Sequence, residues 1–286
     1  MSSTPNPRTV VVGVDESEQS RIALRWAAEH AHRHRAPLRI VYAIDVPVEF
    51  GPGVVAPLFD TERLRAHGES VVAAAATQAA EHAEVTISTL AQEGPPVAVL
   101  REQSRSALLV VVGSRGLGAL RRTLLGSVST SLARHAECPV AVIPETEPGA
   151  RGAVVVGVDG SACSAEAVAL AFDEAARRDA RLVAVHAWSE FFRYDARPTM
   201  QTQGESVLAE SLAGYAEKYP DVAVERVVVE DRPAAAVLAA AADAQLIVVG
   251  SHGRGGFAGM TLGSVAQAVL HGADCPLIIT RGESRP

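Results

Sequence analysis

Two copies of one glycine pattern are the residues of this chain best suited to hold an anion. The first copy is Gly-Ser-Arg-Gly at residues 113–116, followed after nine residues by Gly-Ser at residues 126–127. The second is Gly-Ser-His-Gly at residues 250–253, again followed after nine residues by Gly-Ser at residues 263–264. Glycine lets a backbone approach phosphate closely, and backbone N–H groups at the start of a helix can bind it. The repeat therefore indicates two modules that each handle an anionic small molecule.

A carboxylate recurs in the same register. Residues 10–15 and residues 154–159 both read Val-Val-Val-Gly-Val-Asp, so Asp15 and Asp159 end matching apolar runs. In a parallel sheet whose strand order reverses beside the first strand, this aspartate and the glycine loop would face one ligand. The alternative for the aspartates is a helix cap, and the alternative for the glycines is a plain strand-to-helix turn.

Each half alternates apolar runs of strand length with longer helical patterns. Near-continuous Val, Ile and Leu runs separated by helices predict a parallel sheet that is covered on both faces. We therefore predict an α/β fold with two tandem doubly wound domains, at residues 1–147 and 148–286. Each is expected to be a five-stranded parallel sheet, of strand order 3-2-1-4-5, with helices on both faces. In the first half we expect strands at 10–14, 38–43, 85–91, 108–112 and 140–143, helices at 20–34, 61–82, 96–103 and 124–135, an irregular loop at 45–60 and a linker at 145–152.

Composition narrows the class of protein. The 286 residues are 48% hydrophobic and 21% charged, which fits a globular protein, and the formal net charge of -7 argues against a nucleic-acid binder. The polar N-terminal stretch resembles no leader, and no apolar run reaches the length of a membrane span. We expect a cytoplasmic protein without nucleic-acid or membrane partners. The three cysteines form no C-x-x-C pattern, so we expect small buried thiols rather than a metal or redox framework.

The combination of motifs resembles a known family. A strand ending in Gly-Val-Asp, followed by Ser-x-x-Ser and paired with a G-x2-G-x9-G-[ST] loop, closely resembles the universal stress protein family in its ATP-binding branch. The tandem arrangement is similar to the two-domain members from actinobacteria and spans about residues 10–280. The resemblance implies a regulatory protein of the stress response that holds ATP, alone or with Mg²⁺, in each domain. It also implies an intramolecular pseudo-dimer of the two domains through their last strands, with a homodimer as a further option.

The resemblance carries nucleotide contacts over to both halves. In the first half they are Gly13, Asp15, Ala43, Gly113, Arg115, Gly116, Gly126, Ser127, Val128 and Ser129. In the second half they are Gly157, Asp159, Ala187, Gly250, His252, Gly253, Gly263, Ser264 and Val265. Ala266 stands where the first half has Ser129, so we expect the second site to bind more weakly. Arg121 and Arg122 in the first spacer either neutralise phosphate or form a solvated pair, and the second spacer has no counterpart.

Patterns typical of enzymes are missing from the sequence. It contains no G-x4-G-K-[ST] loop, no G-x-S-x-G elbow and no paired carboxylates that we would defend as catalytic. His30 and His34 share a helix face and could pair around a metal, but cations favouring a helix C-terminus explain them better. We therefore predict no catalytic residues and no metal site. The alternatives to an ATP-binding regulator are a slow ATPase or nucleotidyl-handling enzyme using the same site, and a scaffold with vestigial pockets.

Overall fold

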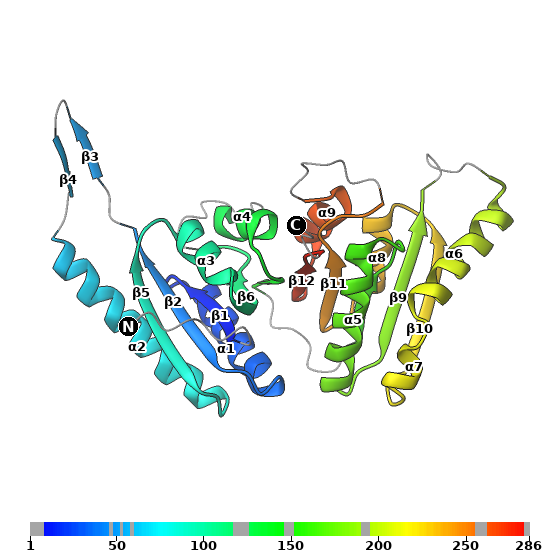
Figure 1. Cartoon of the computed structure of the whole chain (residues 1–286), viewed down its shortest axis with the longest axis horizontal. Coiled ribbons are helices and arrows are strands. Elements are labelled where there is room, and N and C mark those ends of the chain that lie inside the picture. Colours follow the sequence, from blue (N-terminus) through cyan, green and yellow to red (C-terminus); the bar gives the residue numbers. More distant parts are fainter. Residues whose placement is uncertain are drawn as a thin grey trace. The chain divides into compact units, whose positions relative to one another are not determined.

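The chain folds into two compact units, Met1–Glu145 and Thr146–Pro286. The computed structural model describes residues 9–45, 48–51, 54–57, 60–116, 126–145, 152–189, 195–254 and 262–282. Each unit has its own parallel sheet and its own helices, which Figure 1 labels in chain order. Among these residues, no helix combines the length and the apolar composition that crossing a bilayer requires.

The sheet of the first unit has the strand order β5-β2-β1-β6-β7. Its central strand pairs in parallel with two neighbours, so that Val12 lies opposite Ile40 on one side and Val111 on the other. The predicted order 3-2-1-4-5 and the parallel direction are therefore confirmed. The strands are β1 (Thr9–Val14), β2 (Leu38–Ile44), β5 (Ile87–Glu93), β6 (Ala107–Gly113) and β7 (Val140–Ile143).

Two pairs of helices cover this sheet. Helices α1 and α2 pack against each other on one face, and α3 and α4 pack against each other on the opposite face (Figure 1). Side-chain caps fix where α1 and α2 begin. The Ser17 side chain accepts a hydrogen bond from the Ser20 N–H of α1, and the Asp60 side chain accepts from the Glu62 and Arg63 N–H groups of α2. The helices are α1 (Glu18–Arg33), α2 (Thr61–His82), α3 (Pro96–Ser104) and α4 (Ser127–His135).

The second unit repeats this plan, with the strand order β10-β9-β8-β11-β12. Its strands are β8 (Val154–Gly157), β9 (Leu182–Trp188), β10 (Val224–Glu230), β11 (Leu246–Gly250) and β12 (Leu277–Thr280). Its helices are α5 (Ala162–Arg177), α6 (Arg197–Ser211), α7 (Tyr215–Lys218), α8 (Pro233–Ala240) and α9 (Ser264–Gly272).

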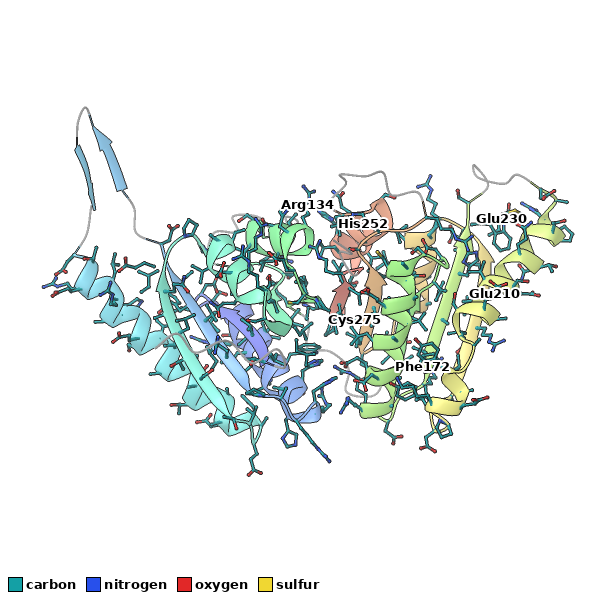
Figure 2. All side chains as sticks on the ribbon, in the orientation of Figure 1. Arg134, Phe172, Glu210, Glu230, His252 and Cys275 are labelled. Carbon is teal, nitrogen blue, oxygen red and sulfur yellow. The ribbon has the colours of Figure 1, made fainter. Side chains whose placement is uncertain are left out.

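The second helix is where the two units differ. In the first unit α2 is continuous, whereas in the second unit Gly214, at φ 78°, separates α6 from the short α7. A left-handed glycine ends helices readily because it has no Cβ to clash. The break lets Tyr215 and Tyr219 stack on Phe172, with ring centroids 4.6 and 5.6 Å away (Phe172 is labelled in Figure 2). Phe172 is fully buried, so this stack anchors the end of α5.

One expectation about the first unit is wrong. Residues 45–60 were expected to form an irregular loop, but they contain an antiparallel hairpin of β3 (Val48–Gly51) and β4 (Val54–Pro57). β-Branched and aromatic residues on both sides of a glycine- and proline-containing turn favour such a hairpin. It forms a two-stranded sheet of its own, separate from the parallel sheet. Most of the predicted linker, residues 146–151, lies outside the described residues.

Candidate functional site

The predicted loop and aspartate meet at one end of each sheet. Asp15 follows β1 and Gly113 ends β6, and these two strands are parallel neighbours. The chain leaves them in opposite directions, toward β2 and toward β7, which is the switch point where doubly wound sheets bind ligands. Asp159 and Gly250 have the same relation at the ends of β8 and β11. We call these two places the first site and the second site.

In both sites the loop glycine touches the aspartate directly. A Cβ on Gly116 would collide with the Asp15 carboxylate, and a Cβ on Gly253 would collide with the Asp159 carboxylate. In the second site the backbone also bonds to the carboxylate, because the Arg254 N–H donates to Asp159 Oδ2 at 3.0 Å. Each aspartate and its glycine loop therefore form one continuous surface.

The aspartates are not helix caps. The N-caps of α1 and α5 are Ser17 and Ser161. Each side chain accepts a hydrogen bond from the backbone N–H three residues later in the chain. Asp15 Oδ1 instead accepts from the N–H and hydroxyl of Ser17, at 3.2 and 2.5 Å. Asp159 Oδ1 accepts from the Ser161 N–H at 2.9 Å. The simple capping alternative is therefore wrong, and each aspartate organises the turn before the cap.

The same hydrogen bonds set the charge state of Asp159. Burial of its carboxyl raises the pKa, but hydrogen bonds from Ser161 and the Arg254 N–H outweigh burial and hold the pKa below its ordinary value. Asp159 is therefore a carboxylate at neutral pH. Its oxygens are already bonded to the turn and the loop, which makes it a structural tie between the two.

The loops close identically in both units. The Gly126 N–H donates to the Ser114 carbonyl, and the Gly263 N–H donates to the Ser251 carbonyl, each at 2.7 Å. Gly126 and Gly263 are also the N-caps of α4 and α9, and among the described residues no side chain accepts a hydrogen bond at either cap. The first N–H groups of a helix lack intrahelical acceptors and carry the positive end of its dipole. These two helix starts are thus suited to an anion.

Ser129 has a role that the sequence did not reveal. It is 1% exposed, and its hydroxyl lies 3.1 Å from the Ser114 carbonyl and 2.9 Å from the Gly126 carbonyl. A hydroxyl in this position donates to the backbone and fastens the loop, so a direct contact of Ser129 with phosphate stays a prediction. Ala266, at the same place in the second unit, has no hydroxyl to donate to the loop, which keeps the backbone bond from Gly263 to Ser251.

The side chains inside the loops differ between the sites. Arg115 forms an ion pair with Glu145, Nη1 to Oε1 2.9 Å, and the Arg115 side chain is 24% exposed. At the matching position of the second loop, His252 Nδ1 lies 3.1 Å from Ser251 Oγ. The first loop thus carries a guanidinium paired with a carboxylate, and the second an imidazole beside a hydroxyl.

The remaining predicted contacts fall into three groups. Gly13 and Gly157 face helices: a Cβ on Gly13 would lie 2.8 Å from Leu100 of α3, so close helix packing explains this glycine. Ala43 and Ala187 lie near the ends of β2 and β9, the strands that pair with β1 and β8. The others begin the helices at the loops: Ser127 and Val128 in α4, and Ser264 and Val265 in α9. Arg121 and Arg122 lie outside the described residues.

Several residues near the first site carried no sequence signal. Gln19 donates through Nε2 to the Ile143 carbonyl at 2.8 Å, and so ties α1 to the end of β7. Glu16 and His67 approach to 3.0 Å, although they are 51 positions apart. A position-by-position comparison of the two halves could have drawn attention to Glu16, because the second half has Gly160 at the same position.

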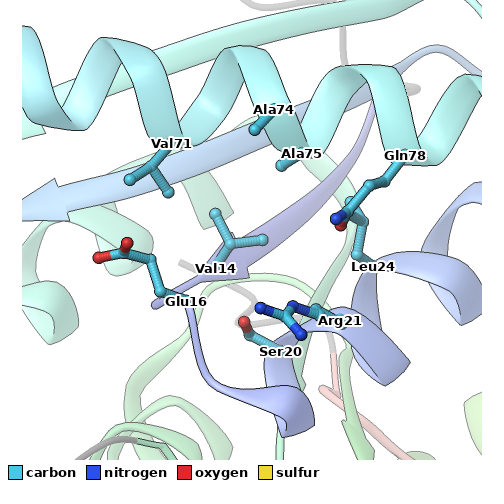
Figure 3. A pocket seen from close by; sticks show the side chains of 9 residues that line it. All are labelled: Val14, Glu16, Ser20, Arg21, Leu24, Val71, Ala74, Ala75 and Gln78. Carbon is cyan, nitrogen blue, oxygen red and sulfur yellow. The ribbon is translucent and has the colours of Figure 1, made fainter.

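A cavity on the other side of the same turn contains none of the predicted contacts. It lies between α1 and α2, and Figure 3 shows the side chains that line it. Alanine and valine side chains of α2 form one wall, and only Glu16 connects the cavity with the turn that carries Asp15. The lining residues are Val14, Glu16, Ser20, Arg21, Leu24, Val71, Ala74, Ala75 and Gln78.

Known proteins resemble the chain over nearly its whole length. The model of the universal stress protein family matches residues 6–144 and again residues 151–281. Universal stress protein Rv2005c of Mycobacterium tuberculosis is 44% identical over 293 residues, which cover 98% of this chain and 99% of the relative. Universal stress protein Rv2623 of the same organism is 41% identical over 294 residues, with the same coverage. A solved universal stress protein from Archaeoglobus fulgidus shares the fold, with a TM-score of 0.71, 20% identity and 98% of each chain covered. The chain belongs to the universal stress protein family and consists of two tandem domains of that family.

Proposed function

We propose that each unit binds an adenine nucleotide, with ATP as the preferred ligand, and that occupancy regulates the protein in a stress response. The observation that carries the proposal is the duplicated contact of Gly116 with Asp15 and of Gly253 with Asp159. It joins a glycine loop to a carboxylate at the switch point of the sheet, twice in one chain. A plain strand-to-helix turn does not require a glycine packed against a carboxylate, so the recurrence of this contact in both units favours a shared binding role.

The residues present fit the proposed ligand. The phosphates would lie at the starts of α4 and α9, where glycine caps leave the backbone N–H groups without a side-chain acceptor. Arg115 in the first site, and His252 in the second, would add positive charge beside them. The adenine would lie toward the backbone of Ala43 or Ala187. Mg²⁺, when it accompanies ATP, would neutralise part of the phosphate charge.

Two measurements on the full chain test this proposal. Denaturing the purified protein and separating the released small molecules shows whether it retains a nucleotide. Calorimetry with added ATP is expected to give up to two sites per chain, and an absence of binding at millimolar ATP to folded protein would overturn the proposal. Phosphate release measured on the same samples distinguishes a protein that holds ATP from the alternative, a slow ATPase.

We also propose, from the family resemblance, that the two domains pair through their final strands. Within its own unit β7 hydrogen-bonds to β6, and β12 to β11; both are short and apolar. A last strand with one neighbour readily accepts another. A protease site placed in residues 146–151 tests this pairing: the cut halves should elute together in size exclusion, and separate elution would contradict it. The same column shows whether two chains form a homodimer.

A further inference from the structure

Glu16 has a backbone conformation that its side chain disfavours. Its φ is 64°, in the left-handed region, while the second unit has Gly160 at φ 75° in the same turn. Glycine adopts this conformation without a steric penalty, and glutamate does not. The first unit therefore keeps an unfavourable residue immediately after Asp15, and the side chain of this residue contacts another element.

That interaction is with His67 of α2. The His67 Nε2 lies 3.0 Å from the Glu16 Oε2, so the turn after β1 is joined to the helix that passes beside it (Figure 3 shows Glu16 and α2 from close by). Gly68 follows His67 and packs against Tyr42. In the second unit Gly204 packs in the same way against His186, which makes Gln203 the counterpart of His67. Both members of the Glu16–His67 pair are thus exchanged for uncharged residues in the other repeat.

The other polar groups around the pair have contacts of their own. Tyr42 of β2 lies edge-on to the His67 ring, with centroids 6.3 Å apart, and burial, followed by the charges of Glu16 and Asp15, raises its pKa. On α2, Arg65 pairs with Glu93 of β5 at 2.6 Å. On α1, Arg21 pairs with Glu18 at 2.9 Å. Histidine is the side-chain type whose charge commonly changes between about pH 5 and pH 8, and the Glu16–His67 contact is an ion pair only when His67 carries a proton.

We propose that Glu16 and His67 are positioning residues for Asp15 and form a proton-linked clamp that regulates nucleotide binding at the first site. The inference rests on the proposed function. With a proton on His67, the ion pair holds the turn that carries Asp15 against α2, and the charge of Glu16 is cancelled. Without that proton the tie weakens, and one uncompensated negative charge stands beside a polyanionic ligand. ATP affinity at the first site should therefore fall when rising pH removes the proton from His67, and binding should take up a proton.

The size of the effect follows from one charge near the ligand. A unit charge several ångströms away, screened by water and salt, changes affinity by about two- to fivefold. The second site has Gly160 and Gln203 at these positions, so it lacks this particular dependence. The clamp would let the two sites of one chain respond differently to a change in pH.

The test uses the replacements that the second unit already contains. In a Gly253→Glu background, which silences the second site, ATP affinity is measured from pH 5.5 to pH 8 for the parent, Glu16→Gly and His67→Gln. The parent should lose two- to fivefold more affinity across this range than either variant, and the ligand's own titration cancels in the comparison. Glu16→Gln, which keeps a hydrogen-bond acceptor but no charge, should behave like Glu16→Gly. Equal pH slopes in all four proteins would overturn the clamp.

A second readout needs no nucleotide. The ring of His67 is titrated by NMR in the full chain, with His67→Gln identifying its signal. In Glu16→Gly the ring should lose its proton more readily, because the carboxylate that favours the charged ring is gone. An unchanged His67 titration would overturn the pair itself. If ATP fails to bind the parent at any pH, the proposed function fails and its regulation with it, whereas binding with equal slopes removes the clamp alone.

Discussion

Gly116 lies so close to Asp15 that no side chain fits between them: a single added Cβ would enter the space of the Asp15 carboxylate oxygen. The two residues are 101 positions apart in the chain, yet the same contact recurs between Gly253 and Asp159. In each unit the requirement for glycine therefore comes from a carboxylate on another strand as well as from the ligand that the loop is proposed to hold.

This contact predicts the effect of enlarging the glycine. Gly116→Ala should weaken ATP binding at the first site at least tenfold, because the Cβ displaces either the loop or the carboxylate, and Gly116→Glu should abolish binding through charge repulsion as well. The same substitutions at Gly253 should act on the second site. Calorimetry on each variant, with circular dichroism to show that the fold is retained, measures the loss.

A double-mutant cycle separates the collision from other causes. Asp15→Ala removes the atoms that the new methyl group would meet, so the pair Gly116→Ala and Asp15→Ala should cost less than the sum of the single changes. Gly214→Ala is the control for a glycine outside both sites: it strains a backbone at φ 78°, so it should lower stability while it leaves ATP affinity unchanged. Strict additivity would show that Gly116 and Asp15 act separately.

The sequence predicted what depends on local patterns. The helix expected at residues 61–82 is found at Thr61–His82, because Asp60 caps it and a long run of helix formers follows. The strand expected at residues 85–91 begins two residues later, at Ile87. It is an edge strand, and its mixture of polar and apolar residues does not define its ends in the sequence. The hairpin at β3 and β4 was missed because the loop-like glycines and prolines outweighed the β-branched residues around them.

Contacts between distant segments were beyond such patterns. The approach of Glu16 to His67, and the bond from Gln19 to the Ile143 carbonyl, depend on how α1 and α2 cross the sheet. For Ser129 the motif predicted the position at the loop but not the contacts. The structure shows that its hydroxyl faces two backbone carbonyls. The alignment of the halves named the site residues, and the packing assigns them their contacts.

Ser129 and Ala266 allow a matched exchange. Ser129→Ala should weaken ATP binding at the first site a few-fold, since the loop loses the hydroxyl that fastens it, and Ala266→Ser should strengthen the second site by supplying that bond. The first site should be the tighter one in the unmodified chain. Each site is measured alone in a background where the other is silenced by Gly253→Glu or Gly116→Glu, and the reverse order of affinities would contradict this explanation.

Cys275 should be unreactive in the folded protein. Burial, followed by the charge of Asp274, raises the pKa of its thiol to about 12, so almost no thiolate exists at pH 8. Iodoacetamide at pH 8 should leave Cys275 unmodified in the native chain and label it after unfolding in guanidinium. Peptide mapping by mass spectrometry reads the result, and the partly exposed Cys163 shows whether the reagent reaches the folded protein. Rapid native labelling of Cys275 would contradict its burial.

Asp159 should make the second unit sensitive to acid. Its folded-state pKa lies below the ordinary value of 3.8, so its stabilising effect is present above that value and is lost as pH falls through the folded-state pKa. Asp159→Asn removes the charge from an acceptor of two backbone N–H bonds, and should lower the free energy of unfolding at pH 7 by about 1–3 kcal/mol. Denaturant unfolding of both proteins at pH 7 and pH 3 measures the difference. The gap between them should shrink at pH 3, below the ordinary value of 3.8, because the carboxyl group of the unfolded chain then takes up a proton that the folded one disfavours. A gap that stays constant would show that the charge of Asp159 does not stabilise the fold.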